Sequence, residues 1–432
     1  MLAYYLDLAR RSFKRNLALT ILMVVAIAFG VGASMTTLTV LHVLAADPLP
    51  GKSGDVYYVQ LDPRHANGAK PGDEPSLQMT RADAEALLRA KRADRQAMMT
   101  GGEAAIEPER AGLQPFFVDA RWTSADFFPM FRVPFVAGGG WTADDDARSA
   151  RVVVISRALA DKLFGEVAVV GRAVRVKGTE LRVVGVIDNW RPTPHFYDLN
   201  TGAYDSTEEV FTPFSTSREL QLTRSGSMDC WRQVPDEEAV GAACVWIQLW
   251  VELGDRKKVA AYRDFLASYS EDQKKAGTYE RPPNVRLRNV AEWLDHKEVV
   301  PRDVHLQTWI ALGFLLVCLV NTVGLLLTKF LRRSGEIGVR RALGASKRSI
   351  FFQLLIEAGT IGLAGGALGL GLAWLGLLAV RHQPTSYAEL AQLDLPRLAA
   401  TFGLAIVTSL LAGVLPAWRG CQVTPAAQLK AP

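Results

Sequence analysis

Apolar residues gather into four long blocks, separated by sequence of ordinary soluble character. The blocks run from about Leu17 to Ala46, Val304 to Phe330, Ile350 to Val380 and Leu398 to Trp418. A helix needs roughly 20 residues, at about 1.5 Å each, to cross about 30 Å of hydrocarbon, so each block is long enough. The pattern predicts four transmembrane α-helices, with a large mixed α+β domain inserted between the first and second helices.

The inserted segment contains stretches with the apolar pattern of β-strands and others with that of α-helices. Short β-branched runs predict strands at Val56–Leu61, Val152–Ser156, Ala173–Val176, Leu181–Ile187 and Val245–Leu253. Helical patterning covers Thr80–Arg95, Arg157–Phe164 and Arg256–Ser270, and Thr80 and Ser156 are expected to cap the helices that follow them. Gly, Asp and Pro-rich breaks predict loops at 62–76, 137–146 and 191–206, and 191–244 is either a second lobe or a long insertion.

Basic residues flank the apolar blocks on one side. Arg10, Arg11, Lys14 and Arg15 precede the first block, and Lys329, Arg332, Arg333, Arg340, Arg341, Lys347 and Arg348 lie between the second and third. The segment between the third and fourth blocks holds one arginine. The positive-inside rule therefore places both termini and the loop 331–349 in the cytoplasm. The net charge of +5 does not by itself indicate nucleic-acid binding, because the sequence has no motif that reads a nucleic-acid groove.

The first block also resembles a signal peptide, since both begin with basic residues and continue into an apolar core. Its apolar stretch is longer than a signal core, and Ala45-Ala46-Asp47 is a weak cleavage site. We expect an uncleaved span.

Two cysteines, Cys230 and Cys244, lie in the inserted segment. In an oxidising compartment they can close a short loop, which would stabilise the fold by roughly 3 kcal/mol on the chain-entropy model. The alternative is two free thiols, and we favour the disulfide.

Motifs for catalysis are missing. Gly51-Lys52-Ser53 supplies only the end of a phosphate-binding loop, and the six histidines lack the spacing of metal ligands. Asp144-Asp145-Asp146 lacks the downstream spacing of an EF-hand and is interpreted as a solvated acidic turn. The sequence predicts no catalytic site, no metal and no cofactor on this chain.

One motif is specific to a family. The run Gly335–Ser346, GEIGVRRALGAS, resembles the cytoplasmic loop of the MacB/FtsX family of ABC permeases, which includes LolC and LolE. Further matches are QLLIEA at 353–358, LPAWR at 415–419 and, in the inserted domain, VVIS at 153–156 and RVVGV at 182–186. The stretch 191–300 matches no named family.

In such permeases the loop implies a coupling helix that docks on a cytoplasmic ATPase. The residues expected to contact the ATPase are Glu336, Gly338, Arg340, Arg341, Ala342, Leu343, Gly344 and Ala345. Glu336 and the two arginines offer charge-assisted contacts, and Ala342, Leu343 and Ala345 supply an apolar face. The alternative is a basic loop on anionic lipid, which needs charge but no fixed pattern of glycine and alanine.

Two polar residues lie inside the predicted spans. A carboxylate in a span is by default a functional candidate, but for Glu357 we favour a structural role, at the cytoplasmic interface or in a contact between helices. Asn321 is expected to make a hydrogen bond between helices.

The resemblance implies three regions: 1–46, the cytoplasmic N-terminus and first span; 47–303, a periplasmic MacB-like domain; and 304–432, an FtsX-like permease domain with the loop 331–349. It places the chain in the bacterial inner membrane as a multi-pass protein.

It further implies a non-catalytic permease subunit that converts ATP hydrolysis by a separate ATPase into periplasmic movement, for export of a substrate. Expected partners are an ABC ATPase dimer binding ATP and Mg, a second permease chain, a periplasmic adaptor, an outer-membrane channel and membrane lipid. The alternatives are a lipoprotein extractor like LolC/LolE, an FtsX-like regulator, and a membrane-anchored peptide sensor.

Overall fold

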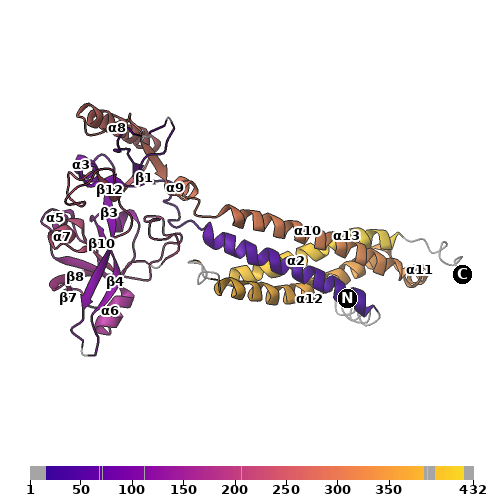
Figure 1. Ribbon diagram of the computed structural model, residues 1–432. Helices are drawn as coiled ribbons and strands as arrows, with labels where there is room; N and C mark the ends of the chain where they lie inside the picture. The colour runs from indigo at the N-terminus through magenta and orange to yellow at the C-terminus, as the bar shows by residue number, and fades with distance from the viewer. Residues whose placement is uncertain are drawn as a thin grey trace. The chain divides into compact units, whose positions relative to one another are not determined.

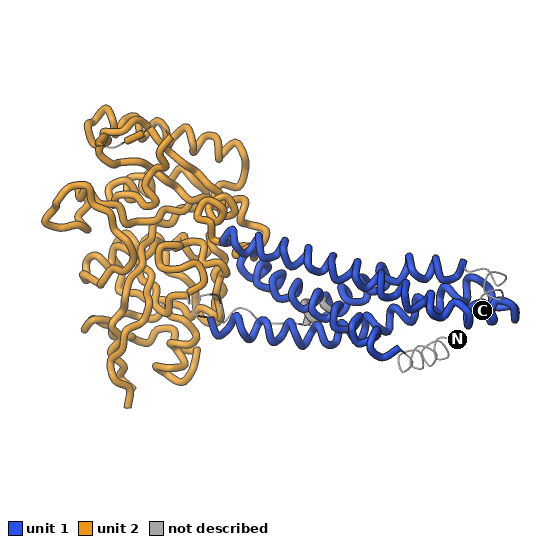
Figure 2. Tube along the Cα trace, turned by 45° about the vertical axis from the view of Figure 1, so that its right-hand side comes forward, with its two compact units in different colours: residues 1–45, 300–432 blue, residues 46–299 orange. Residues whose placement is uncertain are grey.

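The computed structural model describes residues 16–422 except 68, 71, 111, 206, 384–386 and 388–394. The chain divides into two compact units (Figure 2). The helical unit comprises residues 1–45 and 300–432, and the sheet unit comprises residues 46–299. The predicted basic residues Arg10, Arg11, Lys14 and Arg15 lie outside the described residues.

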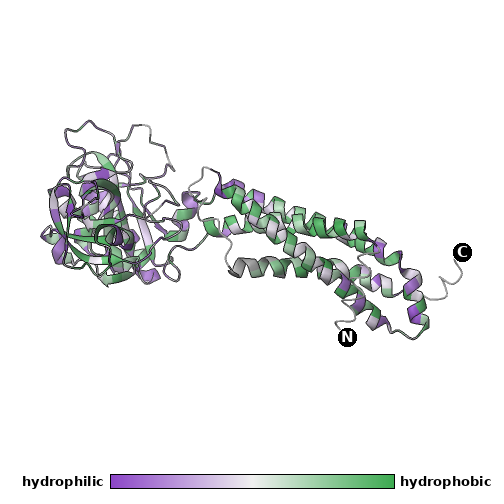
Figure 3. Cartoon of the chain, turned by 90° about the horizontal axis from the view of Figure 1, so that it is seen from below, coloured by the Kyte–Doolittle hydropathy of each residue, from purple (hydrophilic) through white to green (hydrophobic). Residues whose placement is uncertain are grey.

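Within the described residues, four helices are long and apolar enough to cross a membrane. They are α2 (Leu17–Leu44), α10 (Arg302–Leu331), α12 (Lys347–Arg381) and α13 (Leu395–Cys421). Apolar residues run along most of their length (Figure 3). The prediction of four spans, with a mixed sheet domain between the first and second, is confirmed.

Glycines of α12 bring it close to two other helices of the same chain. A Cβ built on Gly365 would lie 2.8 Å from Ile27 Cγ2, and one on Gly362 would lie 2.1 Å from Ser409 Oγ. Such close approach is how helices associate in lipid, where packing rather than hydrophobicity holds them together. These glycines therefore serve packing within the chain, against α2 and α13.

The sheet unit is built on a mixed sheet with strand order β13-β1-β12-β3-β4-β9-β6-β8-β5. Figure 1 labels several of these strands, among them β1, β3, β4, β8 and β12. The strands on this path are β1 (Val56–Gln60), β3 (Arg95–Glu107), β4 (Phe116–Thr123), β5 (Phe135–Gly138), β6 (Val152–Ser156), β8 (Thr179–Ile187), β9 (Val210–Pro213), β12 (Cys244–Glu252) and β13 (Arg286–Asn289). Shorter strands pair beside it: β2 (Met79–Thr80), β7 (Ala173–Val176), β10 (Thr223–Ser225) and β11 (Asp229–Cys230). The helices of this unit are α3 (Arg81–Ala90), α4 (Phe127–Met130), α5 (Ala143–Ala147), α6 (Arg157–Phe164), α7 (Phe214–Glu219), α8 (Arg256–Lys275) and α9 (Val290–His296). Residues 191–244 contribute β9, α7, β10 and β11 to this one unit.

Both faces of the sheet are buried. On β12, Trp250 packs into an aromatic-rich cluster, while its neighbours Leu249 and Val251 pack into a second, mainly aliphatic cluster. Successive side chains of a strand point to opposite faces, so the sheet lies between two cores. This explains why the sequence of β12 is apolar at most of its positions.

The helix predicted at Thr80–Arg95 is too long. Thr80 caps it as expected, with its hydroxyl accepting from the Asp83 N–H, but the helix ends at Ala90. Lys91 then adopts a left-handed conformation with φ of 48°, and Arg95 opens β3. The left-handed residue terminates the helix more abruptly than the sequence periodicity indicates. Ser156 caps α6 as predicted.

The structure pairs Cys230 with Cys244 in a disulfide. The two residues face each other across β11 and β12, as register partners in that strand pair. Cys318 and Cys421 are free and buried.

The first and last strands of the sheet unit are neighbours. β1 pairs antiparallel with β13, with Tyr57 opposite Asn289 and Gln60 opposite Arg286. The first and last strands of the sheet unit, β1 and β13, are therefore adjacent, and only α9 and short connections separate them from the two ends of the unit at residues 46 and 299.

Candidate functional site

A short helix lies between α10 and α12, within the predicted cytoplasmic loop. It is α11 (Ser334–Ala342), which ends in a turn where Gly344 has a φ of 98°. Positive φ is nearly free of strain only for glycine, so this residue type permits the turn. Ser346 then starts α12, with its hydroxyl accepting from the Ser349 N–H.

The predicted coupling residues all lie on α11 or on this turn. Glu336, Gly338, Arg340, Arg341 and Ala342 are on the helix, and Leu343, Gly344 and Ala345 follow it.

The helix has two different faces. Ile337 and Gly338 are buried against the helical unit, whereas Val339 is 57% exposed and Leu343 is 83% exposed. An apolar tip this exposed offers a partner protein an uncovered contact.

Charged contacts tie α11 to its neighbours. Arg340 pairs with Glu336 at 3.0 Å and donates to the Gln353 side chain of α12 at 3.1 Å. Arg341 donates to the carbonyl of Cys421, at the end of α13. The helix is thereby held to α12 and α13 on its inner side, while its tip stays exposed.

Glu357 lies at the centre of a buried charge cluster. Its carboxylate contacts Lys329 Nζ at 2.8 Å and Arg333 Nη1 at 3.0 Å, and its side chain is only 2% exposed. Lys329 also donates to Thr20 Oγ1 of α2 at 3.3 Å, and Arg333 pairs with Glu336 of α11 at 3.3 Å. This cluster therefore joins α2, α10, α11 and α12 at the α11 end of the bundle.

Two members of this cluster, Lys329 and Arg333, were counted in the sequence only as flanking basic residues. A signal for Lys329 is present nonetheless. The buried positions of α10 recur at helical spacing through Leu315, Thr322 and Leu326, and Lys329 continues that row. A lysine on the buried stripe of a helix requires a partner, and Glu357 supplies it.

Asn321 lies apart from this cluster. It is exposed on the outer face of α10 and, within the described part of the chain, makes no hydrogen bond to another helix. It lines a shallow groove along that face together with Val317, Val320, Gly324 and Thr328.

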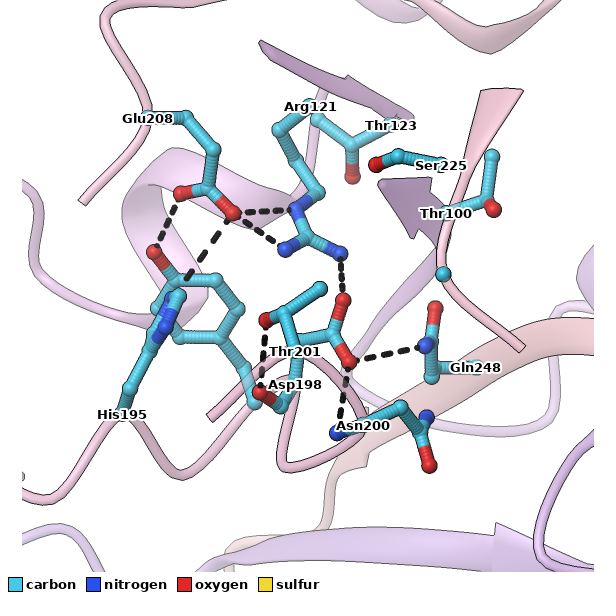
Figure 4. Close-up of polar contacts among 12 residues, drawn as sticks. Thr100, Arg121, Thr123, His195, Asp198, Asn200, Thr201, Glu208, Ser225 and Gln248 are labelled. Carbon is cyan, nitrogen blue, oxygen red and sulfur yellow. Dashed lines mark hydrogen bonds and ion pairs between the residues drawn. The ribbon is translucent and has the colours of Figure 1, made fainter. Parts of the chain in front are cut away.

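A second buried charge cluster lies in the sheet unit (Figure 4). Arg121 of β4 contacts Asp198 at 2.6 Å and also pairs with Glu208, and Tyr197 donates to Glu208 at 2.7 Å. Burial by itself lowers the pKa of Arg121, but the two carboxylates hold that pKa above its ordinary value. The cluster fastens the segment around 195–208 to the sheet.

His195 is part of this cluster but poorly bonded. Its Nε2 lies 3.7 Å from Glu208, and among the described residues neither ring nitrogen has a hydrogen-bond partner. Burial lowers the pKa of His195, so the ring is neutral near pH 7. No sequence pattern indicates this cluster, because Arg121 lies on β4, 77 residues before Asp198, and the stretch that holds the other members has little periodicity.

Among the described residues, no group of His, Cys, Asp and Glu could hold a metal ion. Lys52, in the incomplete phosphate-loop motif, is buried and pairs with Glu252 at 2.9 Å.

Comparison with known proteins identifies two regions of similarity. Residues 20–268 match the MacB-like periplasmic core domain, and residues 309–425 match the FtsX-like permease C-terminal domain. The macrolide export ATP-binding/permease protein MacB of Azoarcus sp. is 26% identical over 304 residues, covering 68% of this chain and 40% of that protein. The pyoverdine export ATP-binding/permease protein PvdT of Pseudomonas putida is 26% identical over 365 residues, covering 84% of this chain and 50% of that protein.

The chain thus spans half or less of the length of these two relatives, at 40% and 50%. Among solved structures, the periplasmic region of MacB from Actinobacillus actinomycetemcomitans aligns with 59% of this chain and 97% of that chain, at 14% identity and a TM-score of 0.38.

Proposed function

The chain belongs to the MacB-like, FtsX-type family of ABC permeases, and from that premise we propose that it couples ATP hydrolysis to movement of its sheet unit. In this proposal a separate ABC ATPase dimer binds ATP and Mg, and this chain has no catalytic role. The sheet unit acts in the periplasm, where it drives export of a substrate. The names of the two relatives, macrolide and pyoverdine export, favour a small-molecule cargo.

The observation that carries the proposal is the exposed tip of α11. Leu343, the residue after the helix, is 83% exposed, although Arg340 and Arg341 just before it hold α11 to α12 and α13. A rigidly held helix with an apolar tip can receive a displacement from a partner and pass it on. This geometry favours docking of a protein over simple contact with lipid headgroups, which requires no apolar tip.

The charge cluster around Glu357 supports transmission of that displacement. Because Glu357 joins α10 to α12 and Lys329 reaches α2, a shift of α11 is shared by several helices at once. The helices α2 and α10 lead directly to the two ends of the sheet unit. We therefore expect the displacement of α11 to reach the sheet unit through movement of α2 and α10.

The expected partner within the membrane is a second permease chain, and we propose that it is a second copy of this one. The outer face of α10 exposes an amide, Asn321, beside Gly324 and Thr328. A polar amide facing lipid is unfavourable, and a small residue beside it lets another helix approach. We place the contact between two copies on this face. The periplasmic adaptor and outer-membrane channel remain part of the proposal for the export route.

The test uses the full chain in nanodiscs, together with the ABC ATPase that co-purifies with it. Leu343→Ala is expected to weaken ATPase binding by at least about tenfold, since burying a leucine contributes ~1.5–3 kcal/mol. Leu411→Ala is the matched control, because Leu411 is 60% exposed but lies on the span α13. Binding is measured by fluorescence titration, and movement of the sheet unit by spin-label distances with and without ATP.

Unchanged binding of the ATPase to Leu343→Ala would contradict docking at this tip. Full movement of the sheet unit with an ATPase unable to hydrolyse or bind ATP would contradict coupling altogether.

A further inference from the structure

A cavity of about 660 Å³ opens in the sheet unit, away from both charge clusters. Its walls come from α3, the first residues of β3, the turn after β4, α5 and α7, which Figure 1 labels. Pockets of roughly 300–1,000 Å³ are the size that encloses drug-sized molecules. The cavity is therefore large enough for a ligand of that class.

Part of the wall is apolar and firmly held. Leu88, Met98 and Phe214 line it, and Met98 and Phe214 belong to the buried core. The Ser124 hydroxyl accepts from the Met98 N–H at 3.0 Å, and the Ser215 hydroxyl donates to the Asp146 carbonyl at 2.6 Å. Because these contacts are internal to the protein, the cavity is formed before any ligand enters.

The inner wall has an excess of hydrogen-bond acceptors. Gln96 is 5% exposed, and its Nε2 donates to the Leu88 carbonyl at 3.1 Å, but its buried Oε1 has no hydrogen-bond partner in the part of the chain that the structure describes. Asp126 accepts from the Gln96 N–H at 3.0 Å, and Asp146 accepts from the Ala125 N–H at 2.7 Å. A buried acceptor without a donor costs free energy unless a ligand supplies one.

The charges around the cavity are unequally paired. Arg81 and Arg89 both pair with Glu85, at 2.7 and 3.3 Å. Asp126 and Asp146, by contrast, have no ion-pair partner within the described part of the chain.

Two further charged residues of the lining are also paired. Arg95 pairs with Glu252 at 2.8 Å, and Asp94 pairs with Lys258 at 2.5 Å. Lys91 is exposed. The lining therefore separates its charges: Arg81 and Arg89 share one carboxylate, whereas the carboxylates of Asp126 and Asp146 accept backbone N–H groups and form no ion pair among the described residues.

We propose that this cavity binds a small amphipathic amine, with its apolar body against Leu88, Met98 and Phe214 and its ammonium group beside Asp126 and Asp146. An amine supplies both features that the wall lacks: a positive charge for the carboxylates and an N–H donor for the Gln96 oxygen. The site does not depend on the proposed coupling to an ATPase, because every residue in it belongs to the sheet unit.

The protonation of Asp146 gives the site a pH dependence. Burial raises the pKa of Asp146 to about 6, despite the hydrogen bonds from Ala125 and Trp141, which lower it. The carboxylate is charged above that pH and neutral below it. An amine therefore binds more tightly at pH 7.5 than at pH 5.

The test uses the full chain in nanodiscs with dansylcadaverine, an amphipathic primary amine, and dansylglycine, which carries a carboxylate in its place. Hydrogen–deuterium exchange locates binding along the chain, so lipid-bound probe does not obscure it. Dansylcadaverine is expected to slow exchange in segments 81–98 and 143–147, and dansylglycine to leave both unchanged.

Three variants complete the test. Ala147→Trp fills the mouth of the cavity from the exposed face of α5 and is expected to abolish the protection, while Ala267→Trp, on the exposed face of α8, is expected to keep it. Asp126→Asn is expected to weaken binding by about tenfold, the loss of one charge-assisted hydrogen bond. Equal protection by dansylglycine, or protection that survives in Ala147→Trp, would overturn the proposal, as would the absence of protection by dansylcadaverine.

Discussion

Glu357 has a role that follows from the cost of burying charge. Its carboxylate and the Lys329 ammonium are both almost inaccessible, and each would be unstable there without the other. The pair therefore holds α10 and α12 in one register. The sequence left a functional and a structural role open for Glu357, and its contacts favour a structural role that transmission of movement can use.

Glu357→Gln is expected to destabilise the helical unit by about 3–5 kcal/mol, because it leaves Lys329 buried without a counter-charge. The measurement is the thermal unfolding midpoint in detergent. The double variant Lys329→Met with Glu357→Met removes both charges and is expected to recover most of that stability. A single variant as stable as the native chain would show that the two charges are not coupled.

His195 gives the sheet unit a sensitivity to acid. Its folded-state pKa lies below the ordinary value because the ring is buried, so protonation favours the unfolded state. The stability it contributes is present above its ordinary pKa of about 6.5 and is lost as the pH falls toward the folded value. Glu208 acts in the same direction at lower pH. Burial raises its pKa, but Arg121 lowers it further, to a value below the ordinary one.

His195→Gln is expected to flatten the fall in stability of the sheet unit between pH 6.5 and 5. The comparison must be between variant and native chain, because Asp146 titrates in the same window with the opposite sign. Its pKa is raised to about 6, so its contribution is present at low pH and is lost as the pH rises. The check is the unfolding midpoint across that range. Parallel curves for the two proteins would rule out a role for His195.

Elements with a strong local pattern were predictable from the sequence. The four spans, β6, α6 and the caps Thr80 and Ser156 follow from hydropathy, alternation and side-chain hydrogen bonding. The end of α3 was not, because a single left-handed residue, Lys91, decides it. The Arg121 cluster and the cavity were not either, since pairing of distant strands brings their members together.

The environment of Asp146 could not be predicted from the residues next to it in the sequence. The run Asp144–Asp146 was interpreted as a solvated acidic turn, yet it forms α5, in which Asp145 completes a capping box with Thr142. Asp146 turns inward instead and accepts from the Trp141 indole at 2.7 Å. Only tertiary contacts distinguish these adjacent carboxylates.

The disulfide stabilises the strand pair β11 and β12. It closes a short loop, with a sequence separation of 14 between the cysteines. Cys230→Ser with Cys244→Ser is expected to lower the unfolding free energy of the sheet unit by about 2–4 kcal/mol, chiefly by loosening the unfolded chain. Chemical unfolding of oxidised, reduced and variant chains checks this. A reduced native chain that unfolds at the oxidised midpoint would contradict it.

At the scale of the whole molecule, the outer face of α10 exposes two polar residues, Asn321 and Thr328, on an otherwise mainly apolar groove. Thr322, the residue after Asn321, is buried against the other helices. Adjacent residues of α10 therefore face opposite sides, with Asn321 on the exposed side. The two positions form an internal pair for testing contact between copies.

Asn321→Cys is expected to form a disulfide between two copies under mild oxidation, in a chain whose Cys318 and Cys421 are replaced by alanine. Thr322→Cys is the matched control and is expected to stay monomeric, because its side chain faces inward. The assay is the band of doubled mass on a non-reducing gel from native membranes. Equal cross-linking at both positions would indicate random collision and would remove the argument for this face.

The pairing of β1 with β13 has a consequence for the history and engineering of such chains. An insertion whose first and last strands are paired makes little demand on the host helices beyond two attachment points. Sheet units of different size or specificity can then replace one another on the same four helices. Such an exchange would alter the sheet unit while leaving α11, the proposed contact with the ATPase, unchanged.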